Sequence, residues 1–195
     1  MLNAFFTRLA RALAPRMHRA FAELDARVER VRVARIREQL GRCGEGVHLN
    51  GRVTIAFPEL AELGDNVHVG DGSQLMAKGG IRIGDHTHIS RNVVIYSANH
   101  NIEGERLPYD DTYLEKPVVI GRNVWVGANV CITPGVTIGD GAVVGMGCVV
   151  SRDVPEMTIV GNEPFRVLGR RDEAHYRKLD AAGKYGGVNG RSLDG

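Results

Sequence analysis

The chain has 195 residues, enough for one core-bearing domain with appendages but too few for two large domains. Glycine accounts for 25 residues and aromatic side chains for only 6%, which argues against an aromatic-rich β-sandwich and favours a repetitive fold. The net charge of +2 is unevenly spread, because residues 1–40 hold nine arginines against four acidic residues.

Residues 1–40 are predicted to be helical and amphipathic, with Pro15 dividing a short helical segment from a longer one. We expect this segment to pack on the end of the following domain or on a neighbouring subunit. Its first twenty residues contain four arginines and no acid, so a second expectation is weak contact with the anionic inner face of a membrane.

Residues 41–160 carry a six-residue repeat of large aliphatic side chains. The repeat is unbroken at Ile120, Val126, Ile132, Ile138, Val144 and Val150. This period is wrong for a helix and too long for a simple alternating strand, but it suits short strands joined by corners that glycine can enter at positive φ. Three faces make one coil of 18 residues, so the sequence predicts an all-β core of about five stacked triangular coils. They are expected at about 43–60, 63–80, 83–100, 120–137 and 138–155.

The repeat breaks at residues 101–119, which are rich in charged side chains. We expect a surface loop there, and long loops on rigid scaffolds often carry function. After the repeat, residues 161–195 include a glycine-rich stretch, so the end of the chain is expected to be a weakly ordered tail.

Four large side chains fall in one outward column of this frame: His48, His68, His88 and Trp125. Aligned imidazoles are compatible with a zinc site, as in the γ-class carbonic anhydrases, which are β-helices with histidine-bound metal. That class has a second histidine five residues after one of its ligands, and this chain has Glu105 and Val93 at those places. A polar column with no metal is the alternative.

The three cysteines show no CxxC spacing, so neither a disulfide framework nor a structural zinc site is indicated, and a reducing, cytoplasmic setting fits best. With no long apolar run and no secretory signal pattern, we expect a soluble protein. Nucleic-acid binding is not expected, because the basic residues lack interleaved aromatic platforms.

Three stretches carry a family likeness. They are IGDHTHISRNVVIYSANH, ending at His100, the run from Ile120 to Pro155, and GNEPFRVLGR, from Gly161 to Arg170. Through them the chain resembles the sugar O-acetyltransferases of the hexapeptide superfamily, such as the galactoside, maltose, nodulation-factor and surface-polysaccharide acetyltransferases. The likeness implies a left-handed parallel β-helix, a homotrimer, and acetyl-coenzyme A bound in a cleft between adjacent subunits. Handedness follows only from the likeness.

The same likeness implies roles for individual residues. His100 matches the catalytic histidine, and Trp125 matches a tryptophan that lines the active site. His88, which the repeat frame places beside Trp125, and Asn99 are expected to line the acceptor side. Matches on the cofactor side are Gly127, Ala128, Met146, Gly147, Ser151, Arg152, Arg166 and, in a shifted position, Arg170. One coil before the histidine, galactoside-type enzymes carry an asparagine near the acceptor, whereas residues 76–80 here read Met-Ala-Lys-Gly-Gly.

Acyl transfer to an alcohol needs a base of near-neutral pKa, and imidazole meets that need. We therefore predict direct attack by a sugar or glycan hydroxyl on acetyl-coenzyme A, with His100 as a surface-facing general base and no metal. Gly127 and Ala128 are candidate amide donors to the developing oxyanion. Alternatives are an N-acetyltransferase acting on an amino sugar, a γ-class carbonic-anhydrase-like metalloenzyme, and a non-catalytic β-helix scaffold.

Overall fold

A computed structural model describes residues 2–104, 108–161, 174, 177–178 and 181 of the chain. The chain forms two units, residues 1–162 and 163–195. In the second unit the described residues are helical and their side chains are exposed. Arg166 and Arg170, both predicted to bind the cofactor, lie outside the described residues.

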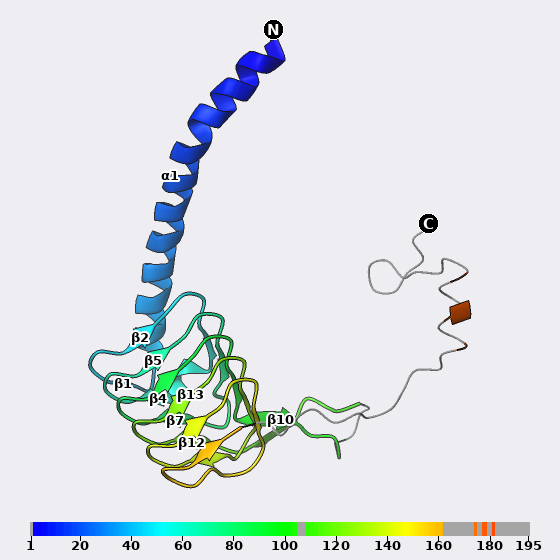
Figure 1. Cartoon of the computed structure of the whole chain (residues 1–195). Coiled ribbons are helices and arrows are strands. Elements are labelled where there is room, and N and C mark those ends of the chain that lie inside the picture. The colour runs from blue at the N-terminus through cyan, green and yellow to red at the C-terminus, as the bar shows by residue number, and fades with distance from the viewer. Residues whose placement is uncertain (1, 105–107, 162–173, 175–176, 179–180, 182–195) are drawn as a thin grey trace. The chain divides into compact units, whose positions relative to one another are not determined.

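The N-terminal segment is one helix, α1 (Leu2–Gln39), with Pro15 inside it. The predicted division into two helices at Pro15 is therefore wrong. Proline removes one backbone donor and crowds the preceding turn. The helical hydrogen bonds on both sides nevertheless keep the helix continuous, with only a gentle curve (Figure 1). Among the described residues, no helix combines the length and the apolar character needed to cross a bilayer.

After α1 the chain winds through three parallel sheets, each made of one strand per coil (Figure 1). The first sheet contains β1 (Arg42–Cys43), β4 (Ala61–Leu63), β7 (Ile81–Ile83), β12 (Val118–Ile120) and β15 (Thr137–Ile138). The second contains β2 (His48–Leu49), β5 (His68–Val69), β8 (His88–Ile89), β13 (Trp125–Val126), β16 (Val143–Val144) and β18 (Ile159–Val160). The third contains β3 (Thr54–Ala56), β6 (Gln74–Met76), β9 (Val94–Tyr96), β14 (Cys131–Ile132) and β17 (Val149–Val150). A 3-10 turn, η1 (Pro58–Leu60), lies between β3 and β4, and two further strands outside the coils are described with the site.

This architecture agrees with the predicted left-handed parallel β-helix, and the number of coils is slightly larger than predicted. Five complete coils are followed by a partial sixth, in which Val154 bridges Ile138 and β18 pairs with β16. The prediction missed it because Val143 pairs with Ile159 after 16 residues, instead of the 18 that separate Trp125 from Val143.

The core is a narrow column of aliphatic side chains, one layer per coil. Its fully buried large members include Leu63, Ile81, Ile95, Ile120 and Ile138. Among the described residues no aromatic ring belongs to this core. Each side of the triangle is so short that valine, leucine and isoleucine fill the interior, which explains why the repeat selects those side chains.

Corner glycines serve two purposes: some, such as Gly141 and Gly147, take positive φ angles of 67° and 70°, and others allow close packing between coils. Asn66, Asn123 and Asn129 take the left-handed conformation at φ 52°, 56° and 57°. Gly84 does not; instead, a Cβ placed on it would lie 2.7 Å from the backbone carbonyl carbon of Gly121 in the next coil. The expectation that glycine enters corners at positive φ holds at other corners, and Gly84 is instead required by close packing.

Aspartates at the corners tie neighbouring coils together. Asp85 Oδ1 accepts a hydrogen bond of 2.8 Å from the Asp65 amide, and Asp140 Oδ1 accepts one of 2.8 Å from the Arg122 amide. The bond from the Arg122 backbone, followed by the one from its side chain, lowers the pKa of Asp140. These carboxylates satisfy corner amides that the strands leave without partners.

Gly84→Ala is predicted to destabilise the coil stack, since the new methyl group would meet the backbone of the next coil rather than a flexible side chain. Overpacking of this kind costs roughly 1–3 kcal/mol in the free energy of unfolding, measurable by urea titration. Gly161→Ala is the control, because a Cβ there meets nothing within 4 Å. Equal stability of the two variants would contradict the close-packing role.

Candidate active site

Where the repeat breaks, the chain leaves the coils as a two-stranded antiparallel ribbon. Strand β10 (Ala98–His100) pairs with β11 (Tyr113–Glu115), which places His100 opposite Tyr113. The coil resumes at Val118 in β12, two residues earlier than expected. The region predicted as a plain surface loop, 101–119, thus contains a strand, because its returning backbone pairs with residues 98–100.

Ser97 fixes the root of this ribbon. Its buried hydroxyl donates to the Met76 carbonyl at 2.8 Å and accepts from the Gly79 amide at 2.9 Å, while its own carbonyl accepts from the Lys116 amide at 2.8 Å. Both ends of the excursion are therefore bonded to the preceding coil. This anchoring sets where the following residues, including His100, leave the coil.

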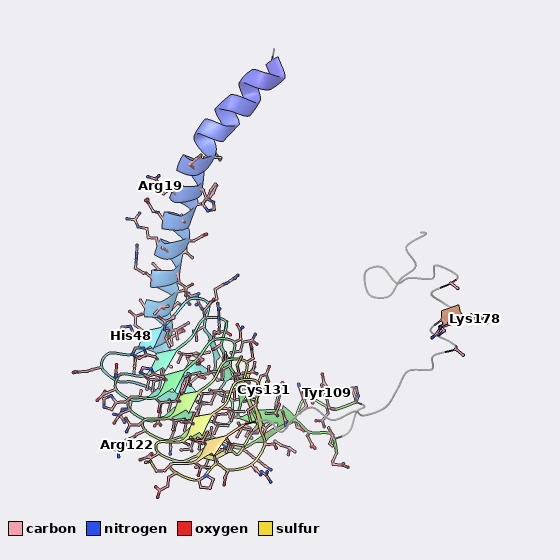
Figure 2. The ribbon with its side chains drawn as sticks, viewed as in Figure 1. Arg19, His48, Tyr109, Arg122, Cys131 and Lys178 are labelled. Atoms are coloured by element: carbon pink, nitrogen blue, oxygen red, sulfur yellow. The ribbon has the colours of Figure 1, made fainter. Side chains whose placement is uncertain are left out.

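His100 is held between aromatic rings of the excursion. Its ring stacks on Tyr109, with centroids 4.0 Å apart and an interplanar angle of 19°, and is tilted against Tyr113 at 4.4 Å and 35°. Its Nδ1 is buried and has no hydrogen-bond partner among the described residues. The imidazole, which was expected to face the surface where the coil gives way to the excursion, is thus half-buried on the ribbon. Figure 2 shows Tyr109 on the part of the chain that projects from the coils.

Lys78 connects the ribbon to the coil behind it. Its Nζ lies 3.5 Å from Glu115 Oε1, 4.7 Å from the centroid of the Tyr113 ring and 5.1 Å from that of Phe57. The lysine thus contacts the same tyrosine that packs against His100. Lys78 occupies the segment in which the sequence departs from the galactoside-type pattern.

The predicted histidine column is present on the second sheet. The rings of His48 and His68 lie 4.7 Å apart, those of His68 and His88 lie 4.3 Å apart, and His88 pairs in register with Trp125. Burial, followed by the neighbouring imidazoles, lowers the pKa of His68, and its Nε2 lies 3.1 Å from Asn66 Oδ1. No group of three or more metal-ligating side chains is found in the described part of the chain.

Trp125 and His88 border one open hollow of about 350 Å³, together with His86, Asn123 and Val124. The indole is 58% exposed, which is unusual for the one tryptophan of a chain poor in aromatic residues. The structure therefore brings these two predicted residues together, but His100 does not line this hollow.

Four of the predicted cofactor residues form one continuous corner between the second and third sheets. The Gly147 amide donates to the Ala128 carbonyl at 2.8 Å, and a Cβ on Gly127 would lie 2.6 Å from the Met146 amide nitrogen. The Gly127 amide donates to the Val144 carbonyl at 2.8 Å. That amide is committed to the coil ladder, so the expectation that it serves an oxyanion is wrong, and Ala128 remains the candidate.

Ser151 and Arg152 line a second hollow, of about 390 Å³, at the corner that follows β17. Both side chains are exposed, and the neighbouring Asp153 accepts a hydrogen bond of 2.7 Å from the Thr137 amide. Asn99 is exposed on the ribbon and pairs in register with Leu114. Because side chains alternate along a strand, Asn99 points away from the side on which His100 packs.

Sequence reasoning missed Tyr109, Tyr113 and Lys78. The two tyrosines lie in a segment that was predicted to be a surface loop from its charged composition, and they follow no periodic pattern. The one available clue was that Tyr109 and Tyr113 are two of the chain's five tyrosines and lie four residues apart in the excursion.

Comparison with known proteins assigns the six-residue repeat to a known family of repeats. A family model described as the hexapeptide repeat of succinyl-transferase matches residues 61–97 and 117–152. YJL218W of Saccharomyces cerevisiae, a candidate acetyltransferase, is 35% identical over 148 residues, covering 73% of this chain and 75% of that protein.

Two solved structures agree with this assignment. The hexapeptide-repeat acetyltransferase VCA0836 of Vibrio cholerae is 34% identical, with a TM-score of 0.64 over 72% of this chain and 80% of that one, and it has also been solved with acetyl-coenzyme A. A maltose O-acetyltransferase from Clostridium difficile 630 is 32% identical, with a TM-score of 0.59 over 71% of this chain and 73% of that one.

The coils and their repeat define a hexapeptide-repeat β-helix protein. Within that class, the similarity in sequence and structure shows that this chain belongs to the hexapeptide-repeat acetyltransferases. The family predicted from the sequence is confirmed.

Lys78→Met is predicted to loosen the ribbon, because it keeps the side chain's length but removes its charge from Tyr113 and Glu115. A cation–π contact contributes about 0.5–1 kcal/mol and an exposed ion pair contributes less. Protease cleavage within residues 101–117 should therefore become several-fold faster in a limited digestion. Arg82→Met, which removes an exposed cation paired with Glu62 at 3.4 Å, should leave that cleavage rate unchanged.

Proposed function

We propose that this protein transfers an acetyl group from acetyl-coenzyme A to a hydroxyl of a sugar or glycan of the cell-surface polysaccharide type. The donor is supported by the acetyl-coenzyme A complex of the Vibrio cholerae relative, and the acceptor class by similarity to a maltose O-acetyltransferase. The observation that carries the proposal is the imidazole of His100, held between two tyrosines on a ribbon that leaves the coils.

His100 is the proposed general base. With Nδ1 buried between the ribbon's rings, Nε2 is the nitrogen left to meet an acceptor. The acceptor oxygen attacks the acetyl carbonyl carbon while Nε2 takes the hydroxyl proton. The tetrahedral intermediate then collapses, the carbon–sulfur bond breaks, and the proton passes from Nε2 to the thiolate of coenzyme A. These steps require neither a covalent enzyme intermediate nor a metal.

The donor is proposed to lie along the corner formed by Gly127, Ala128, Met146 and Gly147 and to continue into the hollow bordered by Ser151 and Arg152. A narrow pantetheine arm suits a corner whose side chains are mostly small, and a guanidinium suits the cofactor's phosphates. Arg166 and Arg170 are proposed as further phosphate contacts. The Ala128 amide is the proposed donor to the oxyanion.

A homotrimer with sites between adjacent subunits completes the proposal. Neither the hollow at Trp125 nor the one at Ser151 and Arg152 includes His100, so a site assembled from two chains accounts for residues that one chain leaves separate. The free cysteines and the acetyl-coenzyme A donor fit a cytoplasmic setting.

His100→Ala is expected to lower kcat by about 10² to 10⁴, the usual effect of losing a general base, while acetyl-coenzyme A affinity and assembly mass stay unchanged. Thiol release, calorimetry and light scattering measure the three quantities. His48→Ala removes an exposed imidazole from the first coil and should retain wild-type turnover. Wild-type turnover by the His100 variant would refute the assignment of the base.

The acceptor class can be tested by thiol release from acetyl-coenzyme A across sugars, amino sugars and glycans. We expect turnover with hydroxyl acceptors and a product whose acetyl group is lost in mild alkali, as esters are and amides are not. An alkali-stable product would indicate N-acetylation. Stoichiometric zinc with hydratase activity would favour the metalloenzyme, and calorimetry without any acetyl-coenzyme A binding would leave only a scaffold.

A further inference from the structure

Helix α1 carries an exposed apolar stripe that its own chain does not cover. The stripe consists of Met17, Phe21, Leu24, Val28 and Val31, which are 54%, 60%, 56%, 59% and 68% exposed. The steps between these residues alternate between four and three, a mean of 3.5 residues, so all five lie along one seam of the helix.

The end of α1 nearest the coils is packed in a different way. Val33, Ile36 and Leu40 lie against the β-helix core. Arg32 donates from Nη2 to the Gly51 carbonyl at 2.9 Å and from Nη1 to the Val53 carbonyl, and it also pairs with Glu29. The last turns are thereby fixed to the first coil, while the stripe extends along the part that projects from the stack (Figure 1).

We propose that this stripe packs against the same stripe of the other copies of the chain in the proposed homotrimer, forming a parallel coiled coil. In heptad terms Phe21 and Val28 occupy a positions, and Met17, Leu24 and Val31 occupy d positions. The a positions thus hold an aromatic and a β-branched residue, and the d positions hold methionine, leucine and valine. A spacing of 3.5 residues keeps such a seam facing a partner over several turns, whereas the 3.6-residue helix alone would drift away from it.

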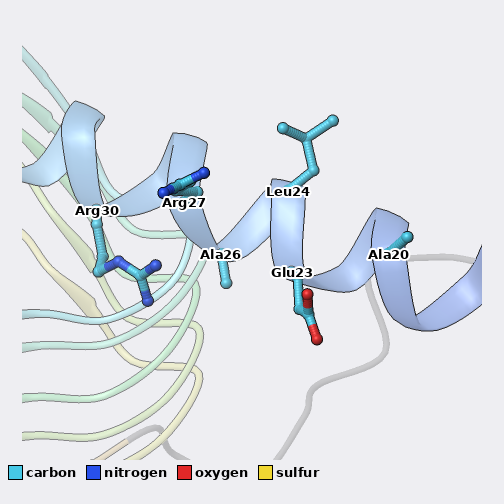
Figure 3. Close-up of a pocket in the computed structure, with 6 residues that line it drawn as sticks. All are labelled: Ala20, Glu23, Leu24, Ala26, Arg27 and Arg30. Atoms are coloured by element: carbon cyan, nitrogen blue, oxygen red, sulfur yellow. The ribbon is translucent and has the colours of Figure 1, made fainter.

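The seam is narrow, which favours a partner helix over a membrane. Its flanking positions hold His18 and Asp25 on one side and Ala20 and Arg27 on the other, so no large apolar side chain widens it there. A membrane-surface helix needs a broad apolar face, and the carboxylate of Asp25 beside the seam would be repelled by anionic headgroups. Figure 3 shows Leu24 and Glu23 pointing away from each other, with Arg27 and Arg30 further along.

The parallel direction follows from the position of the first coil. If two helices ran antiparallel with Met17 opposite Val31, residue 6 of each would lie opposite residue 42 of the other. The N-terminal turns would then collide with the partner's first coil, which begins at β1. In the parallel direction, equal residues meet and the β-helices all lie at the same end.

Disulfide trapping tests this arrangement in the full-length chain. Cys131, the exposed native thiol, is first replaced by serine in every variant. Met17→Cys and Leu24→Cys should each give covalent dimers on a non-reducing gel after mild oxidation. The matched control is Glu23→Cys, one residue from the seam and pointing away from Leu24, which should remain monomeric.

Any of the following outcomes would overturn the proposed parallel coiled coil. No dimers at either seam position, or equal trapping at Glu23→Cys, would rule out the seam. Trapping at Leu24 without trapping at Met17 would indicate an antiparallel pair. Untrapped protein that sediments with phosphatidylglycerol vesicles would assign the stripe to a lipid surface.

The inference stands apart from the proposed activity. Trapping requires no turnover, so dimers in a protein that releases no thiol from acetyl-coenzyme A would preserve the coiled coil and refute only the function. Thiol release without disulfide trapping would preserve the proposed function and refute only the coiled coil. Both measurements can be made on the same preparations.

Discussion

The structure depends on the stacking of successive coils through parallel backbone hydrogen bonds. Each coil contributes one short strand to each of three sheets, and these strands bury a column of single aliphatic side chains. Close stacking requires a residue without Cβ at corners such as Gly84, and it leaves amides that Asp85 and Asp140 satisfy. The six-residue repeat in the sequence thus follows from the coil spacing that the backbone hydrogen bonds impose.

A stack this regular repeats the same outward positions on every coil, and a departure from it presents side chains in new positions. The ribbon β10–β11 is such a departure, and Ser97 bonds its root to the coil below. The tyrosines that pack against His100 come from the excursion, whereas Lys78 comes from the preceding coil. The surroundings of the imidazole therefore combine an irregular segment with a regular one.

The coils could be predicted from the sequence because Ile120 to Val150 repeat a single local geometry, and the outward column of His48, His68 and His88 followed from the same frame. The partial sixth coil could not be predicted, since its shortened step places Glu156 where the frame expects an aliphatic residue. The packing of Tyr109 and Tyr113 on His100 could not be predicted either. It depends on how an aperiodic segment folds back, which no spacing encodes. The predicted division of the helix at Pro15 was wrong because one missing helical hydrogen bond is outweighed by the intact bonds around it.

The seating of α1 on the first coil has a consequence for solubility. A β-helix ends in open backbone edges and an uncovered aliphatic layer, which another molecule's coil could extend into a fibre. Val33, Ile36 and Leu40 lie against that layer, and Arg32 occupies two of the carbonyls near it. At this end of the stack the helix acts as a terminal plug against polymerisation, much as capping units do in other solenoids.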